Sequence, residues 1–106
     1  MNKTINKIYS IKEIKDTIKP ILDKSSVIYA ILFGSYASGT ATSKSDIDLL
    51  INSEGKLRGF DFYEILESLV QKTKKDIDLI EKQEIDKGTF IDNEINSTGI
   101  VVYEKS

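Results

Sequence analysis

The tetrapeptide Asp-Ile-Asp-Leu occurs twice in this chain, beginning at Asp46 and again at Asp76. Each copy alternates a carboxylate with an aliphatic side chain, which is typical of a strand with one polar and one buried face. Asp46 and Asp48 are therefore expected on one face, with Cα atoms about 6.5–7 Å apart. Since neighbouring strands lie about 4.8 Å apart, Asp76 or Asp78 is expected to join them. The repeated tetrapeptide predicts a sheet with carboxylates gathered on one face.

Carboxylates that converge in this way repel one another unless a cation lies between them. Oxygen ligands favour Mg²⁺ or Mn²⁺, shared with phosphate oxygens. The chain has no Cys, His or Trp, so thiolate nucleophiles, disulfides, Cys/His zinc sites and imidazole bases are excluded. Its 17 acidic and 15 basic residues give a net charge of −2, which argues against direct nucleic-acid binding.

The remaining patterns predict an α/β or α+β fold, a small mixed sheet flanked by helices. An N-terminal helix is expected over about 11–23, with Ser10 and Glu13 as a capping box and Pro20 as a kink or stop. Strands are expected at 27–33, 46–51, 76–80 and 100–103, and further helices at 60–72 and 85–96. The lysines that follow the second helix, Lys72, Lys74 and Lys75, are expected to be solvated.

The chain has no linker or low-complexity segment, so residues 1–106 are expected to form one domain with a core over about 27–104. No run of residues approaches the length of about 20 apolar residues that spans a membrane. No secretory leader is recognisable either, and a cytoplasmic location is expected.

A glycine-containing turn precedes the first acidic strand. The apolar run that ends at Phe33 is followed directly by Gly34 and Ser35. Glycine lets a phosphate approach the backbone, and the amides of a turn or helix start can donate to an anion. Alone, such a pair is an ordinary strand ending. Its informative feature is the spacing, because ten residues separate Ser35 from Asp46.

Gly34-Ser35, ten residues and Asp46-x-Asp48 together resemble the central motif of the DNA polymerase β-like nucleotidyltransferase superfamily. The segment LVQKTKKDIDLIE resembles the strand that carries that superfamily's third carboxylate. The ending FIDNEINSTGIVVYE is similar to that of its small members, the minimal nucleotidyltransferase (MNT) proteins that accompany HEPN-domain toxins. The resemblance extends over about residues 25–104 and implies a polymerase β-like nucleotidyltransferase core.

The resemblance implies a role for each matching residue. Gly34 and Ser35 would bind the triphosphate of ATP, the substrate. Asp46, Asp48 and Asp78 would be catalytic and would ligate the metal, two Mg²⁺ ions with Mn²⁺ as the alternative. The lack of histidine is compatible with this chemistry, because metal ions can activate the hydroxyl and neutralise the leaving pyrophosphate.

Two points stay open within that resemblance. Asp78 is preferred to Asp76 as third carboxylate because its Ile-Asp-Leu context matches the family, where that residue lies near the acceptor hydroxyl. Ser38 stands where family members often have Arg or Lys, so the sequence leaves open whether the site is active. Lys44 is the candidate substitute for the missing cation.

The function that the resemblance implies is that of an antitoxin. A Mg²⁺-dependent enzyme of this kind transfers AMP from ATP to a tyrosine hydroxyl of a partner HEPN toxin and so silences it. Few residues follow the last expected strand, so the acceptor is expected on a partner. One alternative is a non-catalytic antitoxin that masks the toxin by binding. Another is a subunit that nucleotidylates a small molecule such as an antibiotic.

Overall fold

The chain folds around a single mixed sheet. The computed structural model describes residues 5–106 of the chain. Residues 1–4 of the expected domain lie outside the described part. In chain order the elements are α1 (Ile11–Asp23), β1 (Tyr29–Phe33), α2 (Gly34–Ser38), β2 (Ile47–Asn52), α3 (Phe60–Thr73), β3 (Ile77–Glu81), the 3₁₀ turn η1 (Lys82–Glu84), α4 (Phe90–Thr98) and β4 (Ile100–Glu104).

The strands are ordered β3-β2-β1-β4. β1 runs antiparallel to both of its neighbours, whereas β2 and β3 are parallel and are joined through α3. The predicted small mixed sheet flanked by helices is therefore confirmed. β3 lies at one edge of the sheet, so the second copy of the Asp-Ile-Asp-Leu tetrapeptide is on an edge strand.

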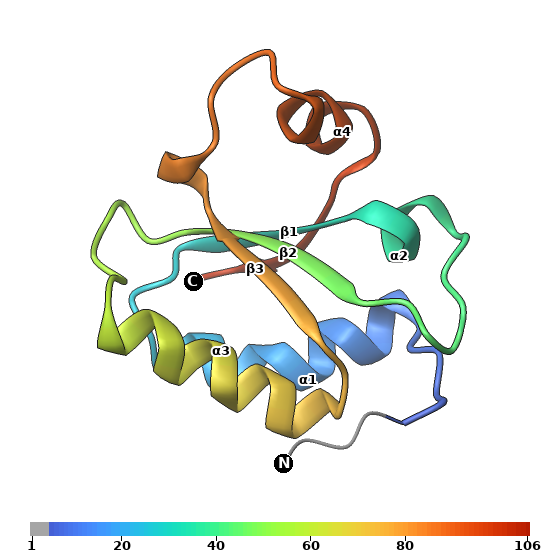
Figure 1. Cartoon of the computed structure of the whole chain (residues 1–106). Helices are drawn as coiled ribbons and strands as arrows, with labels where there is room; N and C mark the ends of the chain where they lie inside the picture. The colour runs from blue at the N-terminus through green and yellow to red at the C-terminus, as the bar shows by residue number, and fades with distance from the viewer. Residues whose placement is uncertain (1–4) are drawn as a thin grey trace.

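The two faces of the sheet are covered differently (Figure 1). α1 and α3 lie side by side under one face, and α4 lies over the other. α2 follows the end of β1 and contacts β1, β2 and α4. The core lies between the sheet and the α1/α3 layer, and its fully buried members include Ile14, Ile18, Leu22, Ala30, Leu32, Ile47, Leu49, Ile51 and Leu69. The α4 side of the sheet remains available for polar groups.

α1 begins with the capping box that the sequence predicted. The Ser10 hydroxyl accepts a hydrogen bond from the Glu13 amide at 3.0 Å, and the Glu13 carboxylate accepts one from the Ser10 amide at 2.9 Å. The helix continues through Pro20 to Asp23, so the predicted range of about 11–23 is confirmed and Pro20 does not end the helix. Pro20 is solvent-exposed, while Ile18 and Leu22 on either side of it are buried and hold the last turn in place.

We expect Ser10→Ala to lower the free energy of unfolding by about 1 kcal/mol, because the Glu13 amide loses its partner at the start of α1. Urea denaturation monitored by far-ultraviolet circular dichroism measures the change. Ser106→Ala, at an exposed position after the last strand, is the control and should leave the midpoint unchanged. Equal midpoints for both variants would show that the capping box contributes nothing.

The last helix begins later than predicted. The apolar spacing predicted a helix over 85–96, but α4 begins at Phe90, after η1 and a loop. Gly88 has a φ of +82°, and the Thr89 hydroxyl accepts a hydrogen bond from the Asp92 amide at 3.3 Å, which makes Thr89 the helix cap. This local turn chemistry overrode the apolar periodicity that included Ile85. Within residues 5–106, no helix is long and apolar enough to cross a membrane.

Candidate active site

The strand register brings Asp48 and Asp78 together. Asp48 of β2 is paired with Asp78 of β3 on one side and with Phe33 of β1 on the other. Ile47 and Leu49 are buried in the core, so strand alternation directs Asp48 to the opposite face, the one that α4 covers. Asp78 shares that face because it is level with Asp48 in the parallel pair.

Asp46 lies just outside β2, not within it as the sequence predicted. The Ile47 amide donates to the Asp76 carbonyl at 3.0 Å, so the two strands already meet at this level. Asp46 and Asp76 are both exposed and precede their strands by one residue. The sheet therefore fixes Asp48 and Asp78 more firmly than it fixes Asp46.

The electrostatics of this face centre on Asp48. The pKa of its carboxyl is raised to about 6, first by burial and then by the neighbouring carboxylates of Asp78, Asp46 and Glu94. Among the neighbouring charges the largest contribution comes from Asp78, which agrees with the register and favours Asp78 over Asp76 as the third member of the group. The ionised form of Asp48 is thus disfavoured, and a cation bound between these groups would relieve the repulsion.

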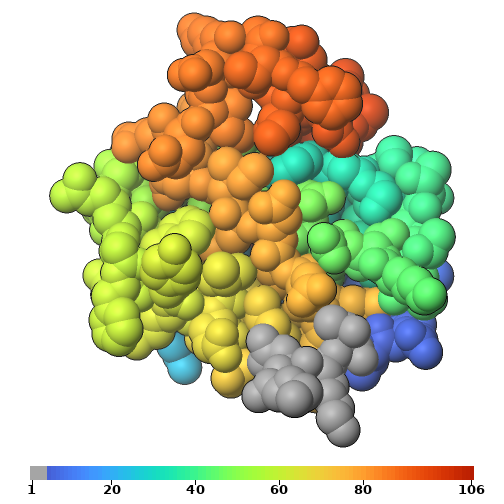
Figure 2. Space-filling model, viewed as in Figure 1, coloured from blue at the N-terminus to red at the C-terminus, as the bar shows by residue number. Residues whose placement is uncertain are grey.

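Glu94 is a member of the group that sequence reasoning missed. It lies on α4, and its charge reaches Asp48 because α4 covers the carboxylate face of the sheet. Its segment resembles the end of MNT proteins, but nothing local distinguishes Glu94 from Asp92, the other acidic residue of α4. Figure 2 shows α4 lying above α2 and against it.

Gly34 lies directly beside Asp48. Its φ is +73°, and a Cβ atom at this position would collide with the Asp48 carboxylate oxygen Oδ2. Glycine is therefore required twice over, by the left-handed backbone and by the close approach of a side chain. The structure thus brings Gly34 against Asp48 of the first acidic strand.

The residues after Gly34 form a short helix where the sequence suggested a turn. α2 contains Ser35 and is anchored by Tyr36, whose side chain is buried in the core. Gly39, with a φ of +80°, ends it. The Ser38 side chain is exposed, and its hydroxyl lies 2.9 Å from the Thr40 hydroxyl. Because serine is uncharged, it provides no positive charge to this region. Lys44 is also exposed, in the loop that leads to Asp46.

The donor set suits a divalent cation that is shared with a ligand. Among residues 5–106, no three acidic side chains are arranged as a ready metal cluster. Mg²⁺ is commonly held by one or two carboxylates together with substrate phosphates, so a complete protein cage is not required. The pairing of Asp48 with Asp78 in register gives this face two adjacent carboxylates that fit a cation, and the raised pKa of Asp48 agrees with that fit.

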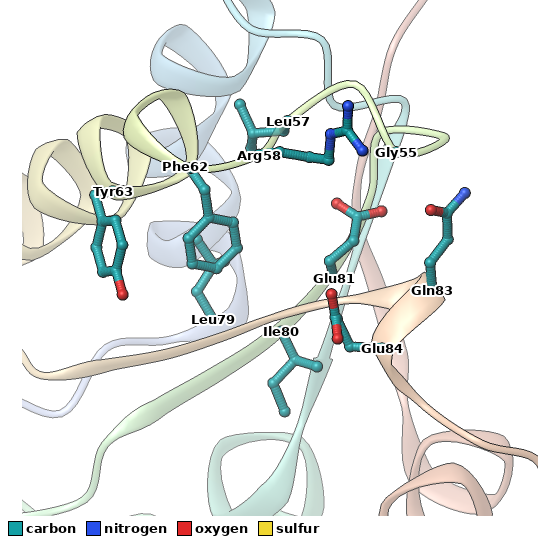
Figure 3. A pocket seen from close by; sticks show the side chains of 11 residues that line it. Gly55, Leu57, Arg58, Phe62, Tyr63, Leu79, Ile80, Glu81, Gln83 and Glu84 are labelled. Carbon is teal, nitrogen blue, oxygen red and sulfur yellow. The ribbon is translucent and has the colours of Figure 1, made fainter.

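A hollow of about 380 Å³ lies at the C-terminal end of β3, beyond Asp78 (Figure 3). Phe62 and Tyr63 from α3 line it together with Leu79 and Ile80 from β3. The buried Glu81 beside it accepts hydrogen bonds from the Ser53 amide and hydroxyl at 3.1 and 2.9 Å, which anchors the loop after β2. This hollow contains none of the residues that the sequence analysis singled out.

Comparison of the sequence with known proteins gives two kinds of match. The family model described as "Polymerase beta, Nucleotidyltransferase" matches residues 16–106. A protein of Methanocaldococcus jannaschii named "Putative protein adenylyltransferase" is 41% identical over 86 residues, which cover 78% of this chain and 83% of that protein. A second protein of the same name and organism is 50% identical over 48 residues, 44% of this chain and 52% of that protein.

Solved structures share the fold at lower identity. A toxin–antitoxin complex with AMP-PNP contains a chain that aligns with a TM-score of 0.71 at 22% identity, covering 87% of this chain and 74% of that one. A complex of a tri-AMPylated Shewanella oneidensis HEPN toxin with its MNT antitoxin aligns with a TM-score of 0.66 at 18% identity, covering 90% and 73%. At these identities the likeness shows a common fold.

Proposed function

Because the chain belongs to the polymerase beta nucleotidyltransferase family, we propose that it is an antitoxin that transfers AMP from ATP to a tyrosine hydroxyl of a HEPN-domain toxin. The observation that carries the proposal is the site itself, in which Gly34 lies against Asp48 and Asp78 lies opposite it in register. The names of the two Methanocaldococcus relatives and the AMPylated Shewanella toxin support the choice of substrate and partner.

Each site residue has a defined part in this proposal. Gly34 leaves room for the Asp48 carboxylate at the start of α2, and Ser35 offers a hydroxyl and an amide to a phosphate. Asp46, Asp48 and Asp78 would hold Mg²⁺, with Mn²⁺ as the alternative. When bound, such an ion lowers the pKa of an attacking hydroxyl and neutralises leaving pyrophosphate.

In this proposal Asp78 accepts the proton of the acceptor hydroxyl. Its position on the edge strand β3 supports that role, because a partner can approach there. In the transfer, the tyrosine oxygen bonds to the α-phosphorus of ATP and the bond to the pyrophosphate oxygen breaks. The products are pyrophosphate and a toxin with AMP on its tyrosine. Use of ATP and of such a toxin would place the protein in the cytoplasm.

Intact-mass spectrometry tests the transfer. The protein is incubated with the product of its neighbouring gene, Mg²⁺ and ATP, and we expect the partner to gain one or more AMP groups. The double variant Asp46→Asn/Asp48→Asn should abolish the gain, whereas Asp16→Asn, an exposed carboxylate on α1, should preserve it. An unchanged gain in the double variant would contradict the proposed catalytic roles.

A binding-only antitoxin is the second candidate, and Ser38 favours it. The Ser38 hydroxyl bonds within its own turn and leaves no positive side chain at that position. On this alternative the Asp variants would still neutralise the toxin, and the toxin would regain activity when the complex is dissociated. A toxin that stays silent and carries AMP after separation supports the transferase.

A further inference from the structure

Lys75 is buried, contrary to the prediction of a solvated helix end. It is 2% exposed, whereas its neighbours Lys72 and Lys74 are exposed. Its ammonium donates a hydrogen bond to the Ser43 carbonyl oxygen at 2.7 Å, across 32 residues of sequence. In the described part of the chain, the ion pairs within 4.0 Å are formed by other lysines. Burying an ammonium is costly, so this contact calls for a structural reason.

The carbonyl that Lys75 holds belongs to the turn that leads to Asp46. Within this turn the Ser45 amide donates to the Thr42 carbonyl at 3.1 Å, and the Thr42 amide donates to the Ser45 hydroxyl at 2.8 Å. Ser43 lies inside that closed turn, and Asp46 is the first residue after the turn. Holding the Ser43 carbonyl therefore fixes the whole turn and the point from which Asp46 departs.

Lys75 is itself held from the end of α3. Its amide donates to the Thr73 hydroxyl at 3.2 Å, and that hydroxyl donates to the Leu69 carbonyl at 2.8 Å. The Tyr9 hydroxyl donates to the Thr73 carbonyl at 2.6 Å. The lysine thus extends from an anchored backbone, and its side chain lines a polar hollow of about 280 Å³ together with Ser43 and Asp46.

We infer that Lys75 is a positioning residue for Asp46. Asp46 is exposed and precedes β2, so sheet pairing alone does not hold it. The Lys75–Ser43 contact on one side and the contact between the Ile47 amide and the Asp76 carbonyl on the other fix the backbone at both ends of this residue. Asp46 is thereby kept next to Asp48 before any ligand arrives. This inference rests on the proposed role of Asp46 as a metal ligand.

The test compares Lys75→Met with Lys72→Met, since both variants remove one positive charge from the same region. Mn²⁺ alone is titrated, and the free ion is measured by electron paramagnetic resonance. We expect Lys75→Met to weaken Mn²⁺ affinity about tenfold, the lower end of the usual effect of residues that orient metal ligands. Lys72→Met should stay within about twofold of wild type, and Lys75→Arg, which can still donate to Ser43, should recover most of the loss.

The sign of the effect separates positioning from simple electrostatics. Removing a positive charge near carboxylates should by itself strengthen cation binding. Weaker binding in Lys75→Met therefore reports the lost hydrogen bond. Hydrogen exchange gives a second readout: we expect the amides of residues 42–46 to exchange faster in Lys75→Met, with those of α1 unchanged.

Equal or tighter Mn²⁺ binding in Lys75→Met, or unchanged exchange over 42–46, would overturn the inference, as would a wild type that binds no Mn²⁺. If Lys75→Met does not unfold cooperatively, Lys75→Gln is measured with the same expectations, since the shorter glutamine side chain also loses the hydrogen bond to the Ser43 carbonyl. Neither readout needs the partner or ATP. A wild type that binds Mn²⁺ but transfers no AMP would count against the proposed function alone.

Discussion

Replacing Asp48 with Asn should give a protein that is more stable than the wild type at neutral pH and that has lost AMP transfer. The pKa of Asp48 is raised to about 6 in the folded chain from the 3.8 of an ordinary aspartate, chiefly by burial. The folded state therefore binds the proton more tightly, and stability falls as pH rises from about 4 to about 6. Asn resembles the neutral acid and avoids this loss.

The expected gain for Asp48→Asn is about 1 kcal/mol in the free energy of unfolding at pH 7.5 without divalent ions, discounted for the half-exposed position of the group. It should disappear near pH 4, where the wild-type carboxyl is also protonated. AMP transfer should fall at least about a thousandfold, or about 4 kcal/mol of transition-state stabilisation. Urea unfolding at pH 7.5 and near pH 4 measures the change in stability. The intact mass of the partner measures AMP transfer.

Asp16→Asn is the control for this prediction, because Asp16 is exposed on α1 and should gain no such pH-dependent stability. A less stable Asp48→Asn protein at pH 7.5 would mean that the carboxylate already has a favourable partner. Added Mg²⁺ should stabilise the wild type and leave Asp48→Asn almost unaffected. Equal stabilisation of both proteins would place the ion elsewhere.

Gly34→Ala should both destabilise the chain and inactivate it. A left-handed φ of +73° costs alanine about 1–2 kcal/mol, and the added Cβ meets Asp48 Oδ2 as well. Asp48 or the backbone of Gly34 must then move. Since a displacement of about 1 Å in a reacting geometry can cost about a hundredfold in rate, we expect a loss of AMP transfer of at least that size.

Gly39→Ala supplies a matched control for Gly34→Ala. Gly39 has a similar φ of +80°, but a Cβ there would meet nothing within 4 Å. Both variants carry the backbone strain, and only Gly34→Ala carries the collision with Asp48. Thermal unfolding and the rate of AMP transfer should therefore show a small stability loss for Gly39→Ala with activity retained. Similar rates for the two variants would show that the close approach at Gly34 is not needed.

Stability and function oppose each other at this face. Packing carboxylates together around Asp48 lowers the stability of the unliganded fold, and in the proposed site the same repulsion would favour binding of a cation. The core on the other face, between the sheet and the α1/α3 layer, compensates for that cost. Asp48 and Asp78 therefore lie on the face of the sheet that does not carry this core.

Local sequence patterns predicted most of the helices and strands and the aspartates of the proposed site. Strand alternation in the repeated tetrapeptide predicted β2 and β3 to within one residue, and the Ser10 capping box predicted the start of α1. These signals are local, because the period of a strand and the capping of a helix depend on residues close in sequence. Turn chemistry at Gly88 and Thr89 is local too, but it competed with the apolar spacing, so α4 begins at Phe90 and not at the predicted residue 85.

Which of these residues meet depends on tertiary packing. Asp78 lies opposite Asp48 because β2 and β3 pair in one register, and strand register is set by which side chains the whole core can bury. Glu94 reaches Asp48 because α4 packs over that face, and Lys75 is buried because the turn before Asp46 closes over it. Contacts between residues tens of positions apart depend on the packing of the assembled chain, which no local pattern encodes.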